Sequence, residues 1–459
     1  MPEGAKQKLF GTDGIRGVAG KFPLDEKTVM RIGRSLVLNL RRELGRAPAI
    51  IIGRDTRESG PEIEAALSRG AESAGATIRS AGVITTPGVA YITRSAPFDA
   101  GVVISASHNP YQDNGIKVFS PTGRKLADEM ERRIEEDVAA SGDEIDANER
   151  DDSDATRNSA SRESKYHDAY INYLVSEVGR GLNLEGMRIA LDCANGAASE
   201  IAPEVFRQLG AKVVVLNAEP DGRNINDGCG SLHMEGLQRT VVDEGLNIGI
   251  AFDGDADRAL FVDARGEVVD GDATMLVLAE YMKSRNELAG SQVVATVMSN
   301  IGLEIALREQ GIELIRAQVG DRYVLEELLA HGAKLGGEQS GHIIFPDISL
   351  AGDGQITAIE LLRVVKESNR SLQELAAQMK RYPQVLVNVR VTSKPEFENV
   401  PAIQSEVEKL ERELAGRGRL LLRYSGTENL ARVMIEGEDQ TQIEEQANRL
   451  AEVIKHAIG

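Results

Sequence analysis

Three aspartates lie within five residues in the segment Asp253-Gly-Asp-Ala-Asp-Arg258, directly after the apolar run 247–252. Like charges this close raise one another's pKa, so the group is costly to keep ionised without a cation. Carboxylate oxygens favour hard ions such as Mg²⁺, Ca²⁺ or Mn²⁺. An EF-hand loop is excluded, because its sixth and twelfth positions would be Arg258 and Ala264 instead of Gly and Glu. A solvated acidic loop is the alternative to a site for Mg²⁺ formed by Asp253, Asp255 and Asp257.

A serine and a histidine stand side by side where another apolar run ends. Residues 101–104 predict a short buried strand, which stops at Ser105-Ala-Ser107-His108 before the turn residues Asn109-Pro110. A hydroxyl at the exposed end of a rigid strand, with a possible base beside it, suits a nucleophile. Taken alone, the segment is better explained as a set of turn-forming residues.

Three further loops carry residues that suit an anionic or hydroxylated ligand. The segment 10–17 has glycines that let the backbone approach a ligand closely, although a plain turn explains it too. The segment 336–342 packs donors and acceptors into a glycine loop, as recognition of sugar hydroxyls requires, and its alternative is a polar turn. The segment Arg423-Tyr-Ser-Gly-Thr-Glu428, with Arg432, offers arginine forks and hydroxyls for an anion.

The amino-acid composition argues against several classes of binding partner. The formal net charge of −19 argues against nucleic acid and anionic membranes, and the absence of tryptophan argues against stacking platforms for single-stranded nucleic acid. Cys193 and Cys229 form no disulfide framework and suit a reducing compartment. No apolar signal core or run of about 18 apolar residues is present. We therefore expect a cytoplasmic protein with no nucleic-acid or membrane partner.

The first third of the chain alternates strands and helices. Strands are expected over 48–53, 77–83 and 101–104, with helices over 61–74 and 87–95. This alternation predicts a mostly parallel sheet with its site at the carboxyl ends of the strands. A helix is also expected over 24–44. Asn114-Gly115 is typical of a tight turn, which would make 116–119 an edge hairpin strand.

Two later segments repeat this plan, and the C-terminal part differs. Strands at 187–195 and 293–299 are each followed by a helix, a glycine and another strand, so three similar units are expected. A polar stretch, 141–164, is expected to be a linker or surface loop. Residues from about 384 predict a small α+β unit, with strands at 385–391, 420–424 and 431–436 and helices at 401–414 and 441–458.

These motifs, taken together and in order, resemble the α-D-phosphohexomutases over nearly the whole chain. The residues 224–231 and Gln339 resemble the branch of that family that acts on glucosamine phosphates. Two residues depart from the usual pattern: Asn429, where the family usually has proline, and Tyr424. The motifs that carry the resemblance are Gly11-Thr-Asp-Gly-Ile-Arg-Gly17, Ser105-Ala-Ser-His-Asn-Pro110, Asp253-Gly-Asp-Ala-Asp-Arg258, Gly337-Glu-Gln-Ser-Gly-His342 and Ser425-Gly-Thr-Glu428.

The resemblance implies an α/β fold with three similar mixed α/β domains and a smaller C-terminal α+β domain around a central cleft. The implied domains are 1–160, 161–257, 258–375 and 376–459. Ser107 would carry the phosphate as phosphoserine, with Mg²⁺ between it and the three aspartates. His108 and Lys117 would transfer protons, and Arg16 and Arg258 would stabilise the transferring phosphoryl group. The residues implied to bind substrate elsewhere are Glu338, Ser340, His342, Arg423, Ser425, Gly426, Thr427 and Arg432.

The activity implied is interconversion of glucosamine 6-phosphate and glucosamine 1-phosphate through a bisphosphate intermediate, on the route to UDP-N-acetylglucosamine. A hexosamine or hexose 1,6-bisphosphate is the expected activator, and the chain is expected to be a monomer or homodimer. A phosphomannomutase/phosphoglucomutase is the nearest alternative. A phosphatase with Asp253 as nucleophile would leave the serine and the arginine-rich loop unexplained, and a non-catalytic sugar-phosphate sensor would not need the nucleophile.

Overall fold

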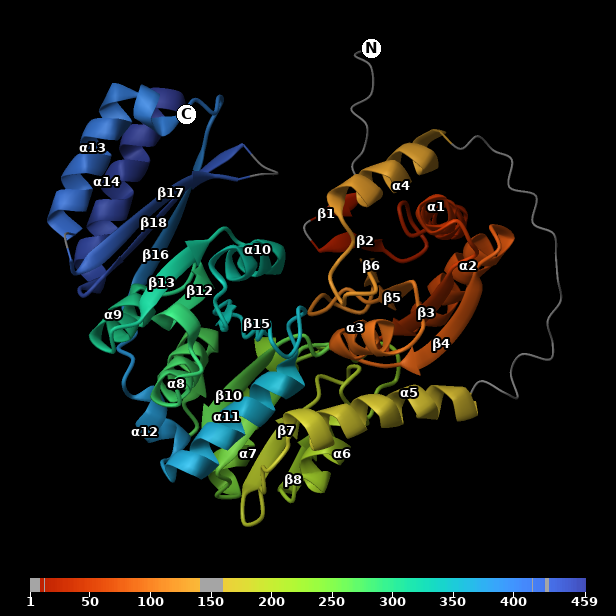
Figure 1. Ribbon diagram of the computed structural model, residues 1–459. Coiled ribbons are helices and arrows are strands. Elements are labelled where there is room, and N and C mark those ends of the chain that lie inside the picture. The colour runs from red at the N-terminus through yellow and green to blue at the C-terminus, as the bar shows by residue number, and fades with distance from the viewer. Residues whose placement is uncertain (1–8, 12, 141–159, 415, 426–428) are drawn as a thin grey trace.

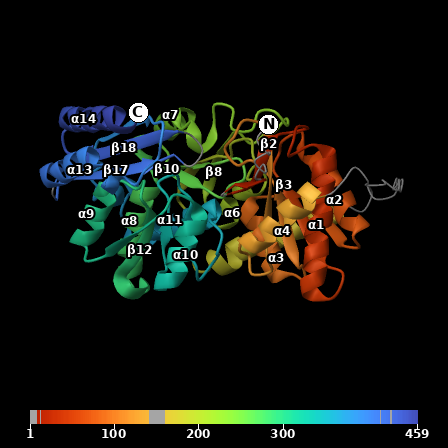
Figure 2. The same cartoon turned by 90° about the horizontal axis from the view of Figure 1, so that it is seen from above.

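The computed structural model describes residues 9–11, 13–140, 160–414, 416–425 and 429–459. The expected linker falls mainly outside these residues, and its last part begins helix α5 (Ala160–Tyr173). Four sheets divide the chain into four units, as expected from the sequence. In two views at right angles, the first and fourth units lie at opposite ends, with the second and third between them (Figures 1 and 2).

The first unit is built on a six-stranded mixed sheet with the order β1-β2-β6-β5-β3-β4. Only β3 pairs in parallel with its neighbours β4 and β5, while β6 is antiparallel to both β5 and β2. The strands are β1 (Phe10–Gly11), β2 (Gly14–Val18), β3 (Ala49–Arg54), β4 (Thr77–Val83), β5 (Ala100–Ile104) and β6 (Asp113–Phe119), and the helices are α1 (Glu26–Leu44), α2 (Gly60–Ser73), α3 (Thr86–Ser95) and α4 (Asp128–Ala140).

One expectation for this unit holds in part and another is wrong. The three alternating strands β3, β4 and β5 pair in parallel, but the sheet as a whole is mixed. Asn114-Gly115 is no turn but part of the interior strand β6. Gly115 is needed there for space, because a Cβ would lie 2.6 Å from the carbonyl oxygen of Ser105 and 2.7 Å from that of Ile15. Asn114 is buried and donates to Ser59 Oγ at 2.9 Å. The doublet therefore serves close strand packing, which local turn statistics do not detect.

The second unit has a five-stranded sheet with the order β11-β10-β9-β7-β8. Its first three strands along the chain are parallel, and β10 turns back antiparallel to β9. The expected boundary between residues 257 and 258 falls inside this β9–β10 hairpin, so the sheet of the second unit continues to Val269. The strands are β7 (Arg188–Asp192), β8 (Lys212–Leu216), β9 (Ile248–Phe252), β10 (Ala259–Asp263) and β11 (Val268–Val269), and the helices after α5 are α6 (Ile201–Gln208) and α7 (Glu235–Asp243).

The third unit has a four-stranded sheet, and the fourth a three-stranded antiparallel sheet with the order β16-β18-β17. The third contains β12 (Gln292–Thr296), β13 (Glu313–Ala317), β14 (Gly336–Gly337), β15 (Ile343–Ile344), α8 (Gly271–Ser284), α9 (Ile301–Glu309), α10 (Asp321–His331) and α11 (Gly354–Ser368). After α12 (Leu372–Ala376), the fourth contains β16 (Gln384–Arg390), α13 (Pro401–Leu414), β17 (Gly418–Tyr424), β18 (Leu430–Gly437) and α14 (Gln440–Ile458).

Buried apolar side chains join the first three units and leave the fourth separate. One continuous cluster contains residues from the sheets and helices of units one to three, such as Val103, Phe252 and Leu361. The fourth unit has its own cluster, centred on β18 and α14. Among the described residues, no helix combines the length and the apolar character that a membrane crossing requires.

Tyr170 of α5 connects three units at one point. Its ring packs against that of Tyr91 in α3, with centroids 5.8 Å apart, and its hydroxyl donates to Asp353 Oδ2 at 2.6 Å. Asp353 is the N-cap of α11 in the third unit. Burial raises the pKa of Asp353 to about 6, and the hydrogen bond from Tyr170 opposes that rise. The bond therefore stabilises the ionised carboxylate at the junction.

We predict that Tyr170→Phe lowers the free energy of unfolding at pH 8 by about 1–3 kcal/mol, because a buried carboxylate loses its donor. The loss is smaller at pH 5, below the folded pKa, where protonated Asp353 no longer needs a donor. Urea titration at the two pH values measures both quantities. Tyr281→Phe is the matched control, because Tyr281 makes the same 2.6 Å bond to Glu367 at the surface. Equal losses in the two variants would contradict the prediction.

Candidate active site

The β9–β10 loop holds Asp253, Asp255 and Asp257 together in the protein interior. One carboxylate oxygen from each lies within 4.8 Å of the others. Asp255 Oδ1 and Asp257 Oδ1 are buried with no hydrogen-bond partner among the described residues. Burial raises the pKa of Asp253 well above its usual value, and the charges of Asp257 and Asp255 raise it further. Converging, unsatisfied oxygens of this kind fit a bound metal ion.

Ser107 is placed against this acidic triad. It follows β5 with a φ of +54°, and its hydroxyl donates to Asp253 Oδ2 at 2.5 Å. The backbone around it is fixed, because Ser107 N donates to Ser105 Oγ at 2.9 Å and Asn226 Nδ2 donates to Ser107 O at 2.9 Å. Arg57 Nη2 donates to the same carbonyl at 3.1 Å. The serine predicted as nucleophile is thus held rigidly beside the candidate metal ligands.

Lys117 on β6 supplies positive charge to the triad. Its Nζ lies 2.9 Å from Asp255, 3.2 Å from Asp13 and 3.6 Å from Asp257. Burial would lower the pKa of Lys117, but these carboxylates raise it well above the usual value. Lys117 is therefore a protonated, buried cation in this arrangement.

His108 has the opposite character. Burial lowers the pKa of His108 to about 4, and the neighbouring Arg258 and Arg16 contribute to the lowering. Arg258 Nη1 lies 2.8 Å from His108 Nδ1, and Ser107 Oγ lies 3.2 Å from the same nitrogen. Because a guanidinium only donates, Nδ1 accepts. His108 is thus a neutral imidazole facing the serine hydroxyl.

His342 contacts the triad from the third unit. Its Nδ1 is 3.5 Å from Asp257 and its Nε2 is 3.8 Å from Asp321. Burial would lower the pKa of His342, but these two carboxylates raise it to about 9. The sequence predicted a substrate contact for His342, and the structure adds a charge contact with a candidate metal ligand.

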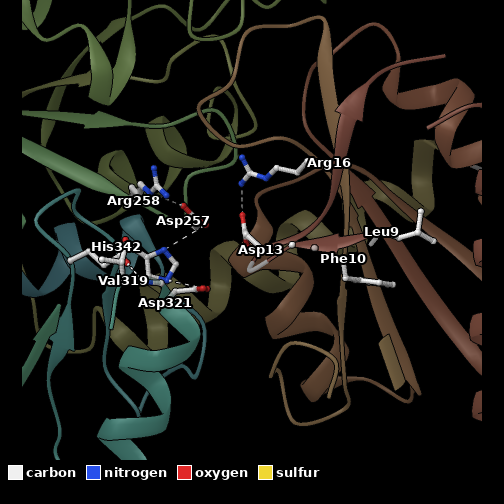
Figure 3. Close-up of a pocket in the computed structure, with 13 residues that line it drawn as sticks. Leu9, Phe10, Asp13, Arg16, Asp257, Arg258, Val319, Asp321 and His342 are labelled. Carbon is white, nitrogen blue, oxygen red and sulfur yellow. Dashed lines mark hydrogen bonds and ion pairs between the residues drawn. The ribbon is translucent and has the colours of Figure 1, made fainter. Parts of the chain in front are cut away.

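A cavity of 610 Å³ opens beside these groups, between the first and third units (Figure 3). Glu338 on its wall accepts from Gly320 N at 3.2 Å and from Ser340 Oγ at 3.1 Å. Arg16 on β2 pairs with Asp13, which directly precedes that strand. The described residues of the segment 10–17 form paired strands rather than a loop, since Phe10 and Gly11 pair with Ile15 and Gly14. The predicted site residues that line the cavity are Arg16, Asp257, Arg258, Glu338 and His342.

The arginine-rich segment of the fourth unit lies apart from this cavity. Arg423 and Arg432 are directly opposite on β17 and β18. Partial burial lowers the pKa of Arg423, and the charge of Arg432 lowers it further. Ser425 is buried, and its carbonyl accepts from Lys394 Nζ at 2.8 Å. Two facing guanidinium groups fit an anion between them. The predicted residues Gly426 and Thr427 lie outside the described residues.

Sequence reasoning missed several residues that hold the site. Asp55 accepts from Ser105 Oγ at 2.5 Å and pairs with the buried Arg57. Thr86 Oγ1 donates to Asp255 Oδ2 at 2.6 Å, and Lys125 pairs with Asp321 at 2.6 Å. The polar segment 55–57 directly follows the apolar strand β3, as the other site loops follow apolar strands. This pattern could have identified Asp55 and Arg57 as site residues.

The chain matches all four domains of one family along its length. Phosphoglucomutase/phosphomannomutase alpha/beta/alpha domains I, II and III match residues 7–144, 168–266 and 270–382, and the C-terminal domain matches 386–453. A phosphoglucosamine mutase of Solibacter usitatus is 49% identical over 98% of this chain and 99% of its own length. A phosphoglucosamine mutase of Pelotomaculum thermopropionicum is 50% identical over 97% of this chain and 99% of its own length.

Solved structures share the fold at lower identity. A phosphoglucomutase/phosphomannomutase family protein of Burkholderia thailandensis is 23% identical and superposes with a TM-score of 0.79, covering 99% of both chains. The N-acetylphosphoglucosamine mutase of Aspergillus fumigatus, solved with GlcNAc-6P and magnesium, is 18% identical with a TM-score of 0.66, covering 98% of this chain and 96% of its own. Both agree with a four-unit architecture.

We predict that a divalent cation stabilises the protein through the acidic triad. With Mg²⁺ as the probe, a concentration of 100 times Kd adds about 2.7 kcal/mol to the unfolding free energy. Asp253→Asn weakens the affinity for Mg²⁺ at least about tenfold, so the gain at the same concentration falls to about 1.4 kcal/mol or less. The cation-free variant is no less stable than the native protein, because buried like-charge repulsion is relieved. Thermal unfolding with and without Mg²⁺ measures both effects.

Asp263→Asn is the matched control for this experiment. Asp263 is a buried aspartate on the same hairpin, and its Oδ1 accepts from Arg265 N at 2.9 Å and from Glu267 N at 3.0 Å. It should keep the full response to Mg²⁺. A full response in Asp253→Asn would contradict the assignment of the triad.

Proposed function

The chain belongs to the phosphoglucomutase/phosphomannomutase family, and we propose that it catalyses the phosphoglucosamine mutase reaction, interconverting glucosamine 6-phosphate and glucosamine 1-phosphate. Relatives about half identical over their full length bear that name. The observation that carries the proposal is the hydroxyl of Ser107, held 2.5 Å from one carboxylate of a buried acidic triad beside a cavity of sugar-phosphate size. The chain is an isomerase in this reading.

We assign the nucleophile and its metal ligands first. Ser107 carries a phosphoryl group, and the converging carboxylates of Asp253, Asp255 and Asp257 would hold Mg²⁺. A bound Mg²⁺ would supply Lewis-acid stabilisation of charge on the transferring phosphoryl group. A sugar hydroxyl oxygen forms a bond to phosphorus while the bond between phosphorus and Ser107 Oγ breaks, which gives a sugar bisphosphate. The second half-reaction reverses these bonds with the other phosphate, so the phosphoserine is restored.

The two candidates for proton transfer, His108 and Lys117, differ in charge. The neutral imidazole of His108 is the better acceptor for the proton of the attacking sugar hydroxyl. The protonated Lys117 is the better donor toward the serine oxygen that is released. Arg258 and Arg16 lie next to His108, where positive charge stabilises the transferring group.

The remaining predicted residues hold the rest of the substrate. Glu338 and Ser340 form a hydrogen-bonded pair at the cavity wall that suits sugar hydroxyls, with His342 beside them. The facing arginines Arg423 and Arg432, with Ser425, Gly426 and Thr427, hold the phosphate that is not transferred. A mutase needs such a second phosphate site, because its bisphosphate intermediate must bind in two orientations.

Several finer points are part of the proposal. A hexosamine or hexose 1,6-bisphosphate primes Ser107, the location is cytoplasmic, and the chain acts as a monomer or homodimer on small sugar phosphates. The preference for glucosamine over glucose or mannose phosphate separates this proposal from a phosphomannomutase/phosphoglucomutase. Comparing kcat/KM for the three hexose 6-phosphates tests it, and a strong preference for glucose or mannose phosphate would reject it.

We predict that Ser107→Ala lowers turnover at least about 10⁴-fold, because the covalent route is removed. Intact-mass measurement and peptide mapping of the native protein should place one phosphate on Ser107 and none on Ser105, because the Ser107 hydroxyl donates to Asp253 of the acidic triad whereas the Ser105 hydroxyl donates to Asp55. The phosphate should survive hydroxylamine, which cleaves the acyl phosphate that an Asp253 nucleophile would form. Turnover by protein without phosphate on Ser107 would refute the mechanism.

A further inference from the structure

A buried polar cluster ties the fourth unit to the third, and Asn300 lies at its centre. Asn300 caps α9 and is 1% exposed. Its Nδ2 donates to Tyr382 O at 2.9 Å and to Glu436 Oε1 at 3.3 Å. Its Oδ1 accepts from Tyr382 N at 3.0 Å and from Gly302 N at 2.9 Å. The side-chain amide thus uses all its donors and acceptors, and two of its bonds hold the segment that connects α12 to β16.

An arginine and a glutamate of the fourth unit complete the cluster. Glu436 is fully buried, and its Oε2 accepts from Arg419 Nε at 2.8 Å and from Arg419 Nη2 at 2.7 Å. The same Nη2 donates to Ser299 O at 3.1 Å, a carbonyl that also accepts from Arg316 Nη1 at 3.1 Å. The third unit therefore offers a carbonyl to Arg419 and an amide to Glu436. We call Asn300, Arg419 and Glu436 the pivot cluster.

Two members of the pivot cluster, Arg419 and Glu436, lie on the same hairpin as Arg423 and Arg432. Arg419 pairs with Glu436 in the register of β17 and β18, and Arg423 pairs with Arg432 four residues further along. At about 3.4 Å per residue, the two pairs are about 14 Å apart. The three-stranded sheet is covered by α13 and α14, which pack on its buried side chains (Figure 1). A rotation at the pivot cluster is therefore carried to the arginines as a rigid displacement.

Burying an arginine–glutamate pair adds little net stability, although it can fix one geometry, since breaking it leaves a buried charge unpaired. We propose that Asn300, Arg419 and Glu436 are positioning residues, which set where Arg423 and Arg432 hold the non-transferred phosphate relative to the cavity. This inference rests on the proposed function. None of the three pivot residues lines the cavity, so they act through the strands that bear the arginines.

Two variants remove contacts of the pivot cluster between the third and fourth units and keep the local structure. Asn300→Ser keeps a side-chain oxygen that can cap α9 but loses the amide bonds to Tyr382 and Glu436. Arg419→Lys keeps the positive charge but loses the fork shared between Glu436 and Ser299. Arg449→Lys is the matched control, because Arg449 makes a similar fork to Glu406 and Glu413 entirely within the fourth unit.

The phosphate that is not transferred is bound alike in the ground state and the transition state, so misplacing its site raises KM more than it lowers kcat. We expect Asn300→Ser and Arg419→Lys to raise KM for glucosamine 6-phosphate about tenfold or more, with kcat within about threefold of native. Arg449→Lys should keep the native constants. Hydrogen exchange at the Tyr382 amide should accelerate in Asn300→Ser and stay native in Arg449→Lys.

Native KM values in both Asn300→Ser and Arg419→Lys, or a lower kcat at unchanged KM, would overturn the inference. Native exchange at Tyr382 in Asn300→Ser would also overturn it. Failure of the proposed function has a different signature, since the native protein would then prefer glucose or mannose 6-phosphate. The same three variants would be compared on that substrate, and the expected split between KM and kcat would be unchanged.

Discussion

Three carboxylates buried in one loop impose the constraint on which the rest of the site depends. Each would be unstable as an isolated buried charge, and a different neighbouring side chain stabilises each of them. Lys117 approaches Asp255 from the first unit, and His342 approaches Asp257 from the third. Asp253 instead receives the hydroxyl of Ser107. Side chains of three units therefore meet at the same charges that make the loop suitable for a metal ion.

The first three units share one apolar cluster, while the fourth has its own. The charges around the triad must be fixed closely, since their interactions are strong in a water-poor interior. In the proposed mechanism, the hairpin that carries Arg423 and Arg432 has a different task, because it would hold either end of a bisphosphate. A separate unit, joined to the others through a polar cluster instead of a continuous core, suits that task.

Much of this organisation could be predicted from the sequence, because the relevant signals are local. The apolar strand before Asp253, the turn after Ser107 and the helix-and-strand order of the C-terminal unit all follow from neighbouring residues. The failures involve distant contacts. Gly115 packs against strands that come from elsewhere in the chain, and Asp55 serves Ser105 fifty residues away. The charge states of His108 and Lys117 also depend on partners from other units, so no local pattern separates them.

The bonds that build the site span long distances along the chain, and this has a consequence for biosynthesis. Ser107 meets Asp253 across 146 residues, and Tyr170 meets Asp353 across 183. Closing such long loops is slow compared with forming local helices, because the entropy of closure is lost before the contacts form. During translation, Ser107 emerges well before the carboxylates that hold it. In the proposed mechanism, its hydroxyl can acquire phosphate beside the acidic triad only after the second unit has been made.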